Sequence, residues 1–332
     1  MADHSASDAR RLAIFHGNLT WMKLPFRRLC TVAASIAVVA SARPVSAQAF
    51  DQRKDIVFAE AHGTGLLMDV FVPKGASNGL AIVDVVSGAW YSDRGKIRDH
   101  TLAGMYEIHC RRGYTVFAVR PGSRTRYTAT EMDRHVKLGI RWVKAHAAEH
   151  AIDPARIGLT GASAGGHLAA LASLTPEDGA PDAKDPLARH STRVRAVGVF
   201  FPPTDFLDWK DGQRGDLKVL GSLLFVDGVE GHSEAEIAER ARSISPLHRV
   251  TRTDVPFLFI HGDADPVVPL KHSEKLRDAI VAAGGRADLI VKKGGGHPWL
   301  TLPVEVAVLA DWFDRELGAT ASGREPKETP RP

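Results

Sequence analysis

Six short apolar runs, separated by segments with a helical apolar period, constrain this chain more than any other feature. The runs are rich in Val, Ile, Leu and Phe and do not alternate cleanly with polar residues, which is typical of strands covered on both faces of a parallel sheet. They lie at 80–86, 114–119, 156–160, 194–201, 256–260 and 287–291. Between the runs, apolar side chains recur at helical spacing, as at 132, 136, 140 and 143. This order predicts an α/β fold with a doubly wound, mostly parallel sheet.

Three further segments lie outside this alternation. Residues 55–73 contain two extended runs around a turn-forming cluster, which predicts an N-terminal β-ribbon. Residues 202–250 are rich in charge and glycine and contain one helical piece near 234–243. We therefore expect a small, lid-like insertion over the sheet edge after the run at 194–201, which is the sixth strand when the two strands of the ribbon are counted. The main domain is expected over 48–317. The Gly/Ser/Pro/Glu-rich end, 318–332, is expected to be disordered.

The N-terminal segment has the three parts of a secretory signal peptide. A basic region over 22–28 precedes an apolar run over 29–42, and the small residues Val45 and Ala47 occupy the positions that signal peptidase reads. We therefore expect residues 1–47 to be an N-terminal extension and signal peptide, and the protein to be secreted or periplasmic. A buried N-terminal helix is the alternative, but the run is short and its flanks suit export.

The charge balance depends on this segment. The whole chain has a formal net charge of +4, but residues 1–47 contain six of its 43 Lys and Arg and two of its 39 Asp and Glu, which leaves 37 of each sign. A mature chain without net charge gives no indication of a nucleic-acid or anionic-membrane partner, and no apolar stretch reaches the roughly 18 residues of a membrane span. Only Cys110 remains after cleavage, so neither an intrachain disulfide nor a cysteine metal cluster is expected.

The sequence Gly161-Ala162-Ser163-Ala164-Gly165 matches the pattern Gly-x-Ser-x-Gly. It follows an apolar run directly and precedes a helical stripe. This is the strand–turn–helix context of a nucleophile elbow, in which the serine has a strained backbone and nearby glycines avoid clashes. An ordinary serine in a tight turn is the alternative, and the context makes it the weaker one. Ser163 is therefore the candidate nucleophile.

A serine nucleophile needs a base, and the base needs a carboxylate that orients it. In this architecture the acid and then the histidine follow the serine along the chain. Asp263 and Asp265 come after the fifth apolar run, at the carboxyl end of a predicted strand, where sites collect. Of the two later histidines, His297 lies in a glycine-rich loop and is the better base, whereas His272 is expected on the surface of a helix.

Five stretches of the chain resemble the α/β-hydrolase superfamily, in its small secreted esterase and lipase-like branch, which includes acetyl and feruloyl esterase-like proteins. They are LLMDVFVP (66–73), SGAW (87–90), IDPARIGLTGASAGGHLAALASL (152–174), HGDADPVVP (261–269) and GGGHPW (294–299). The resemblance implies that Asp265, rather than Asp263, is the triad acid beside Ser163 and His297. It also implies a serine carboxylesterase that hydrolyses short-acyl, acetyl-like esters, carbohydrate-linked ones among them, through an acyl-enzyme.

The chain departs from this family in one loop. Such enzymes usually have His-Gly-Gly-x-Trp after the third strand, whereas this chain has Val86-Ser87-Gly88-Ala89-Trp90. The resemblance places oxyanion-hole donors at the N–H groups of Gly88 and Ala89, with a third at Ala164, the residue after the nucleophile. An oxyanion hole needs backbone amides rather than the replaced side chains, so the departure is compatible with catalysis.

Two tryptophans are candidates for substrate binding. Trp90 lies in the oxyanion loop and Trp299 lies two residues after the candidate base, so both indoles could form the wall of a small acyl pocket. Packing of the two loops onto the core explains them equally well.

Other functions find less support in the residues. A prolyl-oligopeptidase-like serine peptidase shares the HGDAD stretch, but no large propeller domain precedes the hydrolase part here. A non-catalytic binding module is disfavoured because all three triad residues are present. No metal-ligand spacing or dinucleotide-binding glycine loop is evident, so we expect no metal and no cofactor. The expected partner is a small-molecule or polysaccharide-linked ester, and no pattern indicates an oligomeric state.

The signal-peptide prediction can be checked by N-terminal sequencing of the exported protein. Because the small residues at 45 and 47 fit the site that signal peptidase recognises, we expect the sequence to begin at Gln48 or its cyclised form. A cytoplasmic product that retains Met22 would contradict this expectation.

Overall fold

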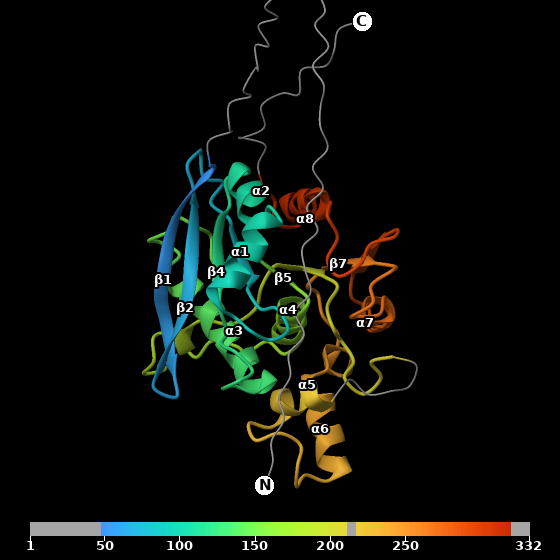
Figure 1. Cartoon of the computed structure of the whole chain (residues 1–332). Coiled ribbons are helices and arrows are strands. Elements are labelled where there is room, and N and C mark those ends of the chain that lie inside the picture. Colours follow the sequence, from blue (N-terminus) through green and yellow to red (C-terminus); the bar gives the residue numbers. More distant parts are fainter. Residues whose placement is uncertain (1–47, 211–216, 320–332) are drawn as a thin grey trace, which may run out of the picture. The chain divides into compact units, whose positions relative to one another are not determined.

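The computed structural model describes residues 48–210 and 217–319 of the chain (Figure 1). The expected signal peptide and nearly all of the expected disordered tail lie outside the described residues. All described residues belong to one compact unit over 47–332.

An eight-stranded sheet forms the centre of this unit. Its spatial order is β1-β2-β4-β3-β5-β6-β7-β8, with antiparallel pairing of β1 to β2 and of β2 to β4, and parallel pairing for the other neighbours. The doubly wound, mostly parallel sheet predicted from the sequence is therefore confirmed. The strands are β1 (Phe50–Ala61), β2 (Thr64–Pro73), β3 (Ala81–Val85), β4 (Thr115–Val119), β5 (Ile157–Ala162), β6 (Ala196–Phe200), β7 (Phe257–Gly262) and β8 (Ala287–Lys292).

Helices cover both faces of the sheet. One apolar core contains side chains of α1 (Arg94–Leu102), α2 (Met105–Arg111) and α8 (Leu302–Glu316). The other contains side chains of α3 (Ala129–Ala145), α4 (Ala164–Leu174) and α7 (Lys271–Ala282). Strand β3 serves both cores, because Val83 and Val85 point into one and Ile82 into the other. This double coverage explains why the central strands read as continuous apolar runs.

The expected insertion contains two helices, α5 (Leu217–Leu224) and α6 (Glu234–Ile244), followed by the short 3₁₀ helix η2 (Pro246–Arg249). Of these, the sequence analysis predicted only α6, which begins at a capping box formed by Ser233 and Glu236. Both helices contact α3, and η2 contacts α4 and α7. The insertion therefore packs on the helices of one face rather than over a sheet edge (Figure 1).

The helices α1 and α2 between β3 and β4 were also absent from the sequence prediction. Helix α1 has a weak apolar pattern, since Ile97 and His100 are its only buried residues. It begins because the Asp93 side chain accepts a hydrogen bond from the Gly95 N–H. Within the described residues, we find no helix that combines the length and the apolar character needed to cross a bilayer.

Candidate active site

Ser163 lies in the sharp turn between β5 and α4, with φ 53° and ψ −120°. A Cβ placed on Gly161 would lie 2.5 Å from the carbonyl carbon of Gly165, and one on Gly165 would lie 2.1 Å from the carbonyl oxygen of Val85. Neither position tolerates a side chain. The Ser163 N–H donates to the carbonyl of Phe200 at 2.9 Å, which anchors the strained residue to β6.

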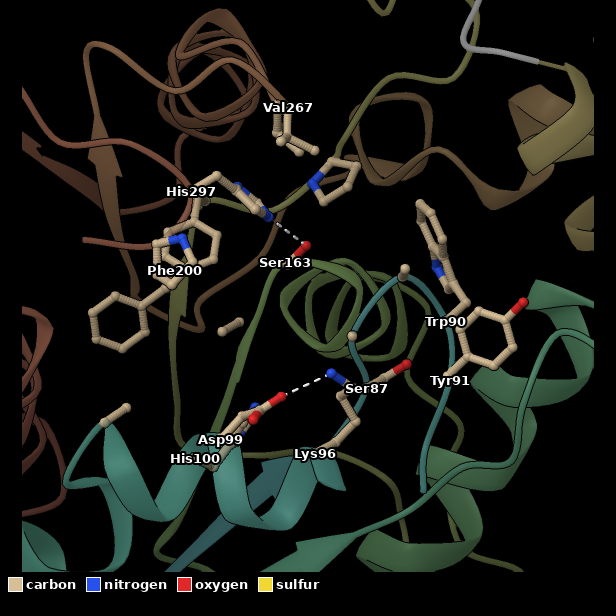
Figure 2. A pocket seen from close by; sticks show the side chains of 18 of the residues that line it. Ser87, Trp90, Tyr91, Lys96, Asp99, His100, Ser163, Phe200, Val267 and His297 are labelled. Atoms are coloured by element: carbon tan, nitrogen blue, oxygen red, sulfur yellow. Dashed lines mark hydrogen bonds and ion pairs between the residues drawn. The ribbon is translucent and has the colours of Figure 1, made fainter. Parts of the chain in front are cut away.

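A chain of two hydrogen bonds joins Ser163 to a buried carboxylate. Nε2 of His297 lies 2.9 Å from Ser163 Oγ (Figure 2). Nδ1 of the same ring lies 2.6 Å from Asp265 Oδ2. When Nδ1–H donates to Asp265, Nε2 is free to accept the serine proton. The structure thus brings together the three residues that the sequence analysis singled out as a triad.

The Asp265 carboxylate is held in its ionised form. Its Oδ1 accepts the N–H groups of Val267 and Val268 at 2.8 and 2.9 Å. Burial would raise the pKa of Asp265, but hydrogen bonds from His261, His297 and the Val268 N–H outweigh it and hold the pKa well below its usual range. A permanent negative charge at this point orients the imidazole and stabilises its protonated form during the reaction.

Asp263, the other candidate acid, has a different role. Its Oδ1 accepts the Gly294 N–H at 2.6 Å, so it holds the loop that carries His297. That loop lies directly against the end of β7, because the Ala264 N–H donates to the Gly295 carbonyl at 3.0 Å. A Cβ on Gly262 would lie only 2.1 Å from the same carbonyl oxygen. The glycines thus bring the acid and histidine loops into contact.

The oxyanion loop is a tight turn over residues 88–91. The backbone groups of Gly88 and Tyr91 exchange two hydrogen bonds of 2.9 Å, and the residues between them, Ala89 and Trp90, have φ of 47° and 60°. Such angles are costly for residues other than glycine and collect at functional sites. The Ser87 carbonyl accepts the N–H of residue 165 at 2.9 Å, so the loop is tied to the first turn of α4.

This geometry corrects the expected set of oxyanion donors. The N–H of Gly88 is already used by the Tyr91 carbonyl. By contrast, the N–H groups of Ala89 and Ala164 donate to no other group within the described part of the chain. Ala164 is the first residue of α4, where backbone N–H groups have no partner inside the helix. Two donors, rather than three, therefore remain for an oxyanion.

The two candidate tryptophans have different surroundings. The Trp90 indole lines the cavity around Ser163 but also donates to Nδ1 of His167 at 3.0 Å, and Nε2 of His167 donates to the Ile244 carbonyl at 2.8 Å. Burial lowers the pKa of His167 to about 4, so it stays neutral and able to accept this bond. The indole is thus both a cavity wall and an anchor of the loop.

Trp299 does not line the cavity, contrary to the expectation from its position. Its indole N–H donates to Glu305 Oε2 at 2.8 Å, and its ring packs edge-on against Phe201. Phe201, which was not predicted as a site residue, lines the cavity where Trp299 does not. Its ring centroid is 4.4 Å from that of His297, and its φ of 36° marks a strained backbone at the end of β6. No sequence pattern distinguished it from the preceding strand residues.

His272 is also placed differently from the expectation of a surface residue. It is fully buried, its Nδ1 accepts the Thr204 N–H at 3.1 Å, and its Nε2 donates to the Trp209 carbonyl at 3.0 Å. Burial lowers the pKa of His272 to about 4. The residue therefore fixes the start of the insertion and is too far embedded there to act as a second base.

The cavity that contains Ser163 and His297 has a volume of about 700 Å³, enough for a ligand larger than an acetyl group (Figure 2). Its walls are mostly apolar, and the insertion contributes Trp209 and Leu220 to them. In the view of Figure 2, polar side chains gather on the side of Ser163 away from His297. We call these residues the polar end, and they are Ser87, Lys96, Asp99 and His100. In the described ranges, no group of three or more His, Cys, Asp or Glu is arranged to hold a metal ion.

Comparisons with known proteins agree with this architecture. The model of the BD-FAE family matches residues 68–280. The probable carboxylic ester hydrolase LipM of Mycobacterium tuberculosis is 28% identical over 200 residues, which cover 60% of this chain and 44% of LipM. Esterase LipC of the same organism is 32% identical over 170 residues, which cover 49% of this chain and 39% of LipC. The chain thus spans less than half the length of these two relatives.

The fold has counterparts among solved structures. One is described as a truncated form of carbohydrate esterase from gut microbiota. It has a TM-score of 0.69 at 24% identity, and the match covers 82% of this chain and 99% of that chain. This likeness extends over nearly all of the described residues and shows the shared fold.

The different contacts of the two aspartates lead to a testable difference. Asp265→Asn removes the charge beside His297 and allows the wrong imidazole tautomer, so we expect kcat for an activated ester such as p-nitrophenyl acetate to fall by about 10³ to 10⁴. Asp263→Asn keeps an oxygen that can accept the Gly294 N–H and should lower kcat less than about tenfold. Equal losses in the two variants would show that the acid is wrongly assigned.

Proposed function

Because the chain belongs to the BD-FAE family, whose match covers more than half of it, we propose that this protein is a serine carboxylesterase acting on short-acyl esters. The observation that carries the proposal is the continuous hydrogen-bonded chain from Asp265 through His297 to Ser163, with the serine open to a cavity. The relatives and the solved structure reported above are all named as esterases or ester hydrolases, so the peptidase alternative has no support from them.

In this reaction Ser163 Oγ attacks the ester carbonyl carbon as its proton passes to Nε2 of His297. The carbonyl oxygen becomes negative and is stabilised by the N–H groups of Ala89 and Ala164. The imidazolium then donates its proton to the alkoxy oxygen, the C–O bond breaks, and the alcohol leaves an acyl-enzyme on Ser163. Water attacks this acyl-enzyme as one of its protons passes to the same imidazole. The imidazolium then returns a proton to Ser163 Oγ as the bond between Oγ and the acyl carbon breaks, and the carboxylic acid is released.

The same proposal includes the class of ester. The polar end lines the cavity on the side of Ser163 away from His297 in Figure 2, so a long apolar acyl chain that reached it would have to displace water from Lys96 and Asp99 without replacing its hydrogen bonds. A short acyl group avoids this cost. A carbohydrate alcohol is compatible with a cavity of about 700 Å³ to which the insertion contributes Trp209 and Leu220, and a structural neighbour described as a carbohydrate esterase supports this choice. Export to the periplasm or medium, inferred from residues 1–47, would expose the enzyme to such esters.

The nucleophile and the base can be tested by substitution. Ser163→Ala and His297→Ala should each lower kcat for p-nitrophenyl acetate by about 10⁴ to 10⁶. The kcat of the double variant should be no lower than that of the less active single variant. The losses overlap because the two residues act as one unit. Ser77→Ala and His190→Ala, which change the same residue types outside the cavity, serve as controls. Ester hydrolysis that survives Ser163→Ala would refute the acyl-enzyme mechanism.

Acyl length provides a separate test. A groove that accepts each added methylene gains about 0.8 kcal/mol, or roughly fourfold in rate. Because the polar end opposes this gain, kcat/KM for p-nitrophenyl esters should fall from acetyl or propionyl toward octanoyl. A maximum at octanoyl or longer would overturn the short-acyl assignment and leave the serine esterase intact.

A further inference from the structure

The polar end of the cavity is built from two neighbouring elements. Ser87 follows β3, and the other three residues lie on one face of α1, at spacings of three and four that place side chains together on a helix. The stem of Lys96 lies across the oxyanion loop, since a Cβ on Gly88 would be 2.7 Å from Cδ of this lysine. The polar end thus adjoins the loop that carries the oxyanion donor Ala89.

The Ser87 hydroxyl is the most unusual group in this cluster. The residue is 1% exposed, and its Oγ has no hydrogen-bond partner among the residues that the structure describes. Its carbonyl oxygen accepts the Gly165 N–H, which fixes its backbone. Buried hydroxyl groups are nearly always paired, so an unpaired one in a cavity wall indicates a place for a ligand atom. The hydroxyl stands where the His-Gly-Gly-x-Trp pattern has a glycine.

The remaining groups offer further hydrogen bonds. Nζ of Lys96 lies 2.7 Å from Asp99 Oδ2, which uses one of its three N–H donors. Nδ1 of His100 lies 2.7 Å from the buried Asp84, and its Nε2 has no hydrogen-bond partner within the described part of the chain. Because Lys96 and His100 both line the cavity, these unused hydrogen-bonding atoms are available to a ligand.

The charges of the polar end are balanced in pairs. The Lys96 ammonium faces the Asp99 carboxylate, and His100 faces Asp84. Burial would lower the pKa of His100, but the Asp84 carboxylate outweighs it and raises the pKa. With His100 protonated, the state that a raised pKa favours, both pairs add little net charge to the cavity. Such a surface suits a neutral group that both donates and accepts, such as a hydroxyl, better than a carboxylate or an alkyl chain.

The position of His297 decides which part of the ester reaches the polar end. The leaving oxygen must approach Nε2 of His297, so the alcohol lies on that side of Ser163. The polar end lies on the opposite side in Figure 2. We propose that Ser87 and Lys96, with Asp99 and His100, form a subsite that binds a hydroxyl group on the acyl part of the substrate. The preferred esters are then those of short hydroxy acids. This inference rests on the proposed esterase function.

Matched ester pairs test this subsite. The pairs are p-nitrophenyl butanoate with 3-hydroxybutanoate, and hexanoate with 6-hydroxyhexanoate, which place the hydroxyl at two depths. In the wild-type protein, kcat/KM should be about tenfold higher for the hydroxylated member of at least one pair, the effect expected of one hydrogen bond to a charged group. Ser87→Ala and Lys96→Met should each lower this preference at least fivefold.

Arg98→Met is the matched control. It removes one positive charge from the same helix, but Arg98 is exposed and does not line the cavity, so the preference should not change. Ser87→Ala removes an unpaired hydroxyl and keeps the fold testable if Lys96→Met proves unstable. A preference below twofold in both pairs, or one that both variants retain, overturns the subsite.

Two further outcomes separate this inference from its premise. If the wild-type protein hydrolyses neither butanoate nor acetate in a Ser163-dependent way, the proposed function itself fails. The second comparison uses ethyl acetate and 2-hydroxyethyl acetate, which differ by a hydroxyl on the alcohol. If Ser87→Ala and Lys96→Met alter only the preference between these two esters, the polar end binds the leaving alcohol, and the assignment to the acyl group is wrong.

Discussion

The site depends on the contact between the first turn of α4 and the end of β3. The carbonyl oxygen of Val85 occupies the position that a side chain on residue 165 would need, and the Gly165 N–H donates to the Ser87 carbonyl. This approach forces the turn at Ser163 into a conformation with positive φ and places the helix terminus against the oxyanion loop. The nucleophile and the Ala164 and Ala89 donors are therefore held by one set of backbone contacts, before any side chain is considered.

A second backbone contact brings the other half of the triad to this point. Gly262 at the end of β7 lies against the carbonyl of Gly295, in the loop after β8. Two chain segments that each follow a parallel strand are thus in direct backbone contact at the carboxyl edge of the sheet, where ligands bind in α/β proteins. Asp263 ties the second loop to the first, and Asp265 then reaches His297. The acid that orients the base and the acid that holds its loop are different residues, two positions apart.

Which parts of the structure can be predicted from the sequence depends on the range of the interactions that form them. The strands, α3 and the turn at Ser163 were predictable because their signals are local: apolar runs, a 3.6-residue period and glycines flanking a serine. Helix α1 was missed because it buries a single large apolar side chain, Ile97. The surface assignment of His272 was wrong, and the two possible roles of Trp299 could not be told apart, because their partners, Trp209 and Glu305, are set by tertiary packing. Periodicity contains no information on such contacts. The choice of Asp265 over Asp263 likewise came from family resemblance and not from spacing.

Two hydrogen bonds through His167 link the insertion to the oxyanion loop. The Trp90 indole in the oxyanion loop donates to His167 on α4, and His167 donates to the Ile244 carbonyl at the end of α6. Phe206 packs against both Trp90 and His167, while its neighbour Trp209 lines the cavity. Because His167 is neutral and buried, it can bridge only if one nitrogen accepts and the other donates. A displacement of α6 would therefore break the bond from His167 to Ile244, which fixes the tautomer that accepts the indole N–H. It would thereby weaken the support of a turn whose Ala89 and Trp90 already have costly backbone angles. The insertion thus contributes to the oxyanion loop as well as to the cavity wall, which ties substrate selection and transition-state stabilisation to the same segment.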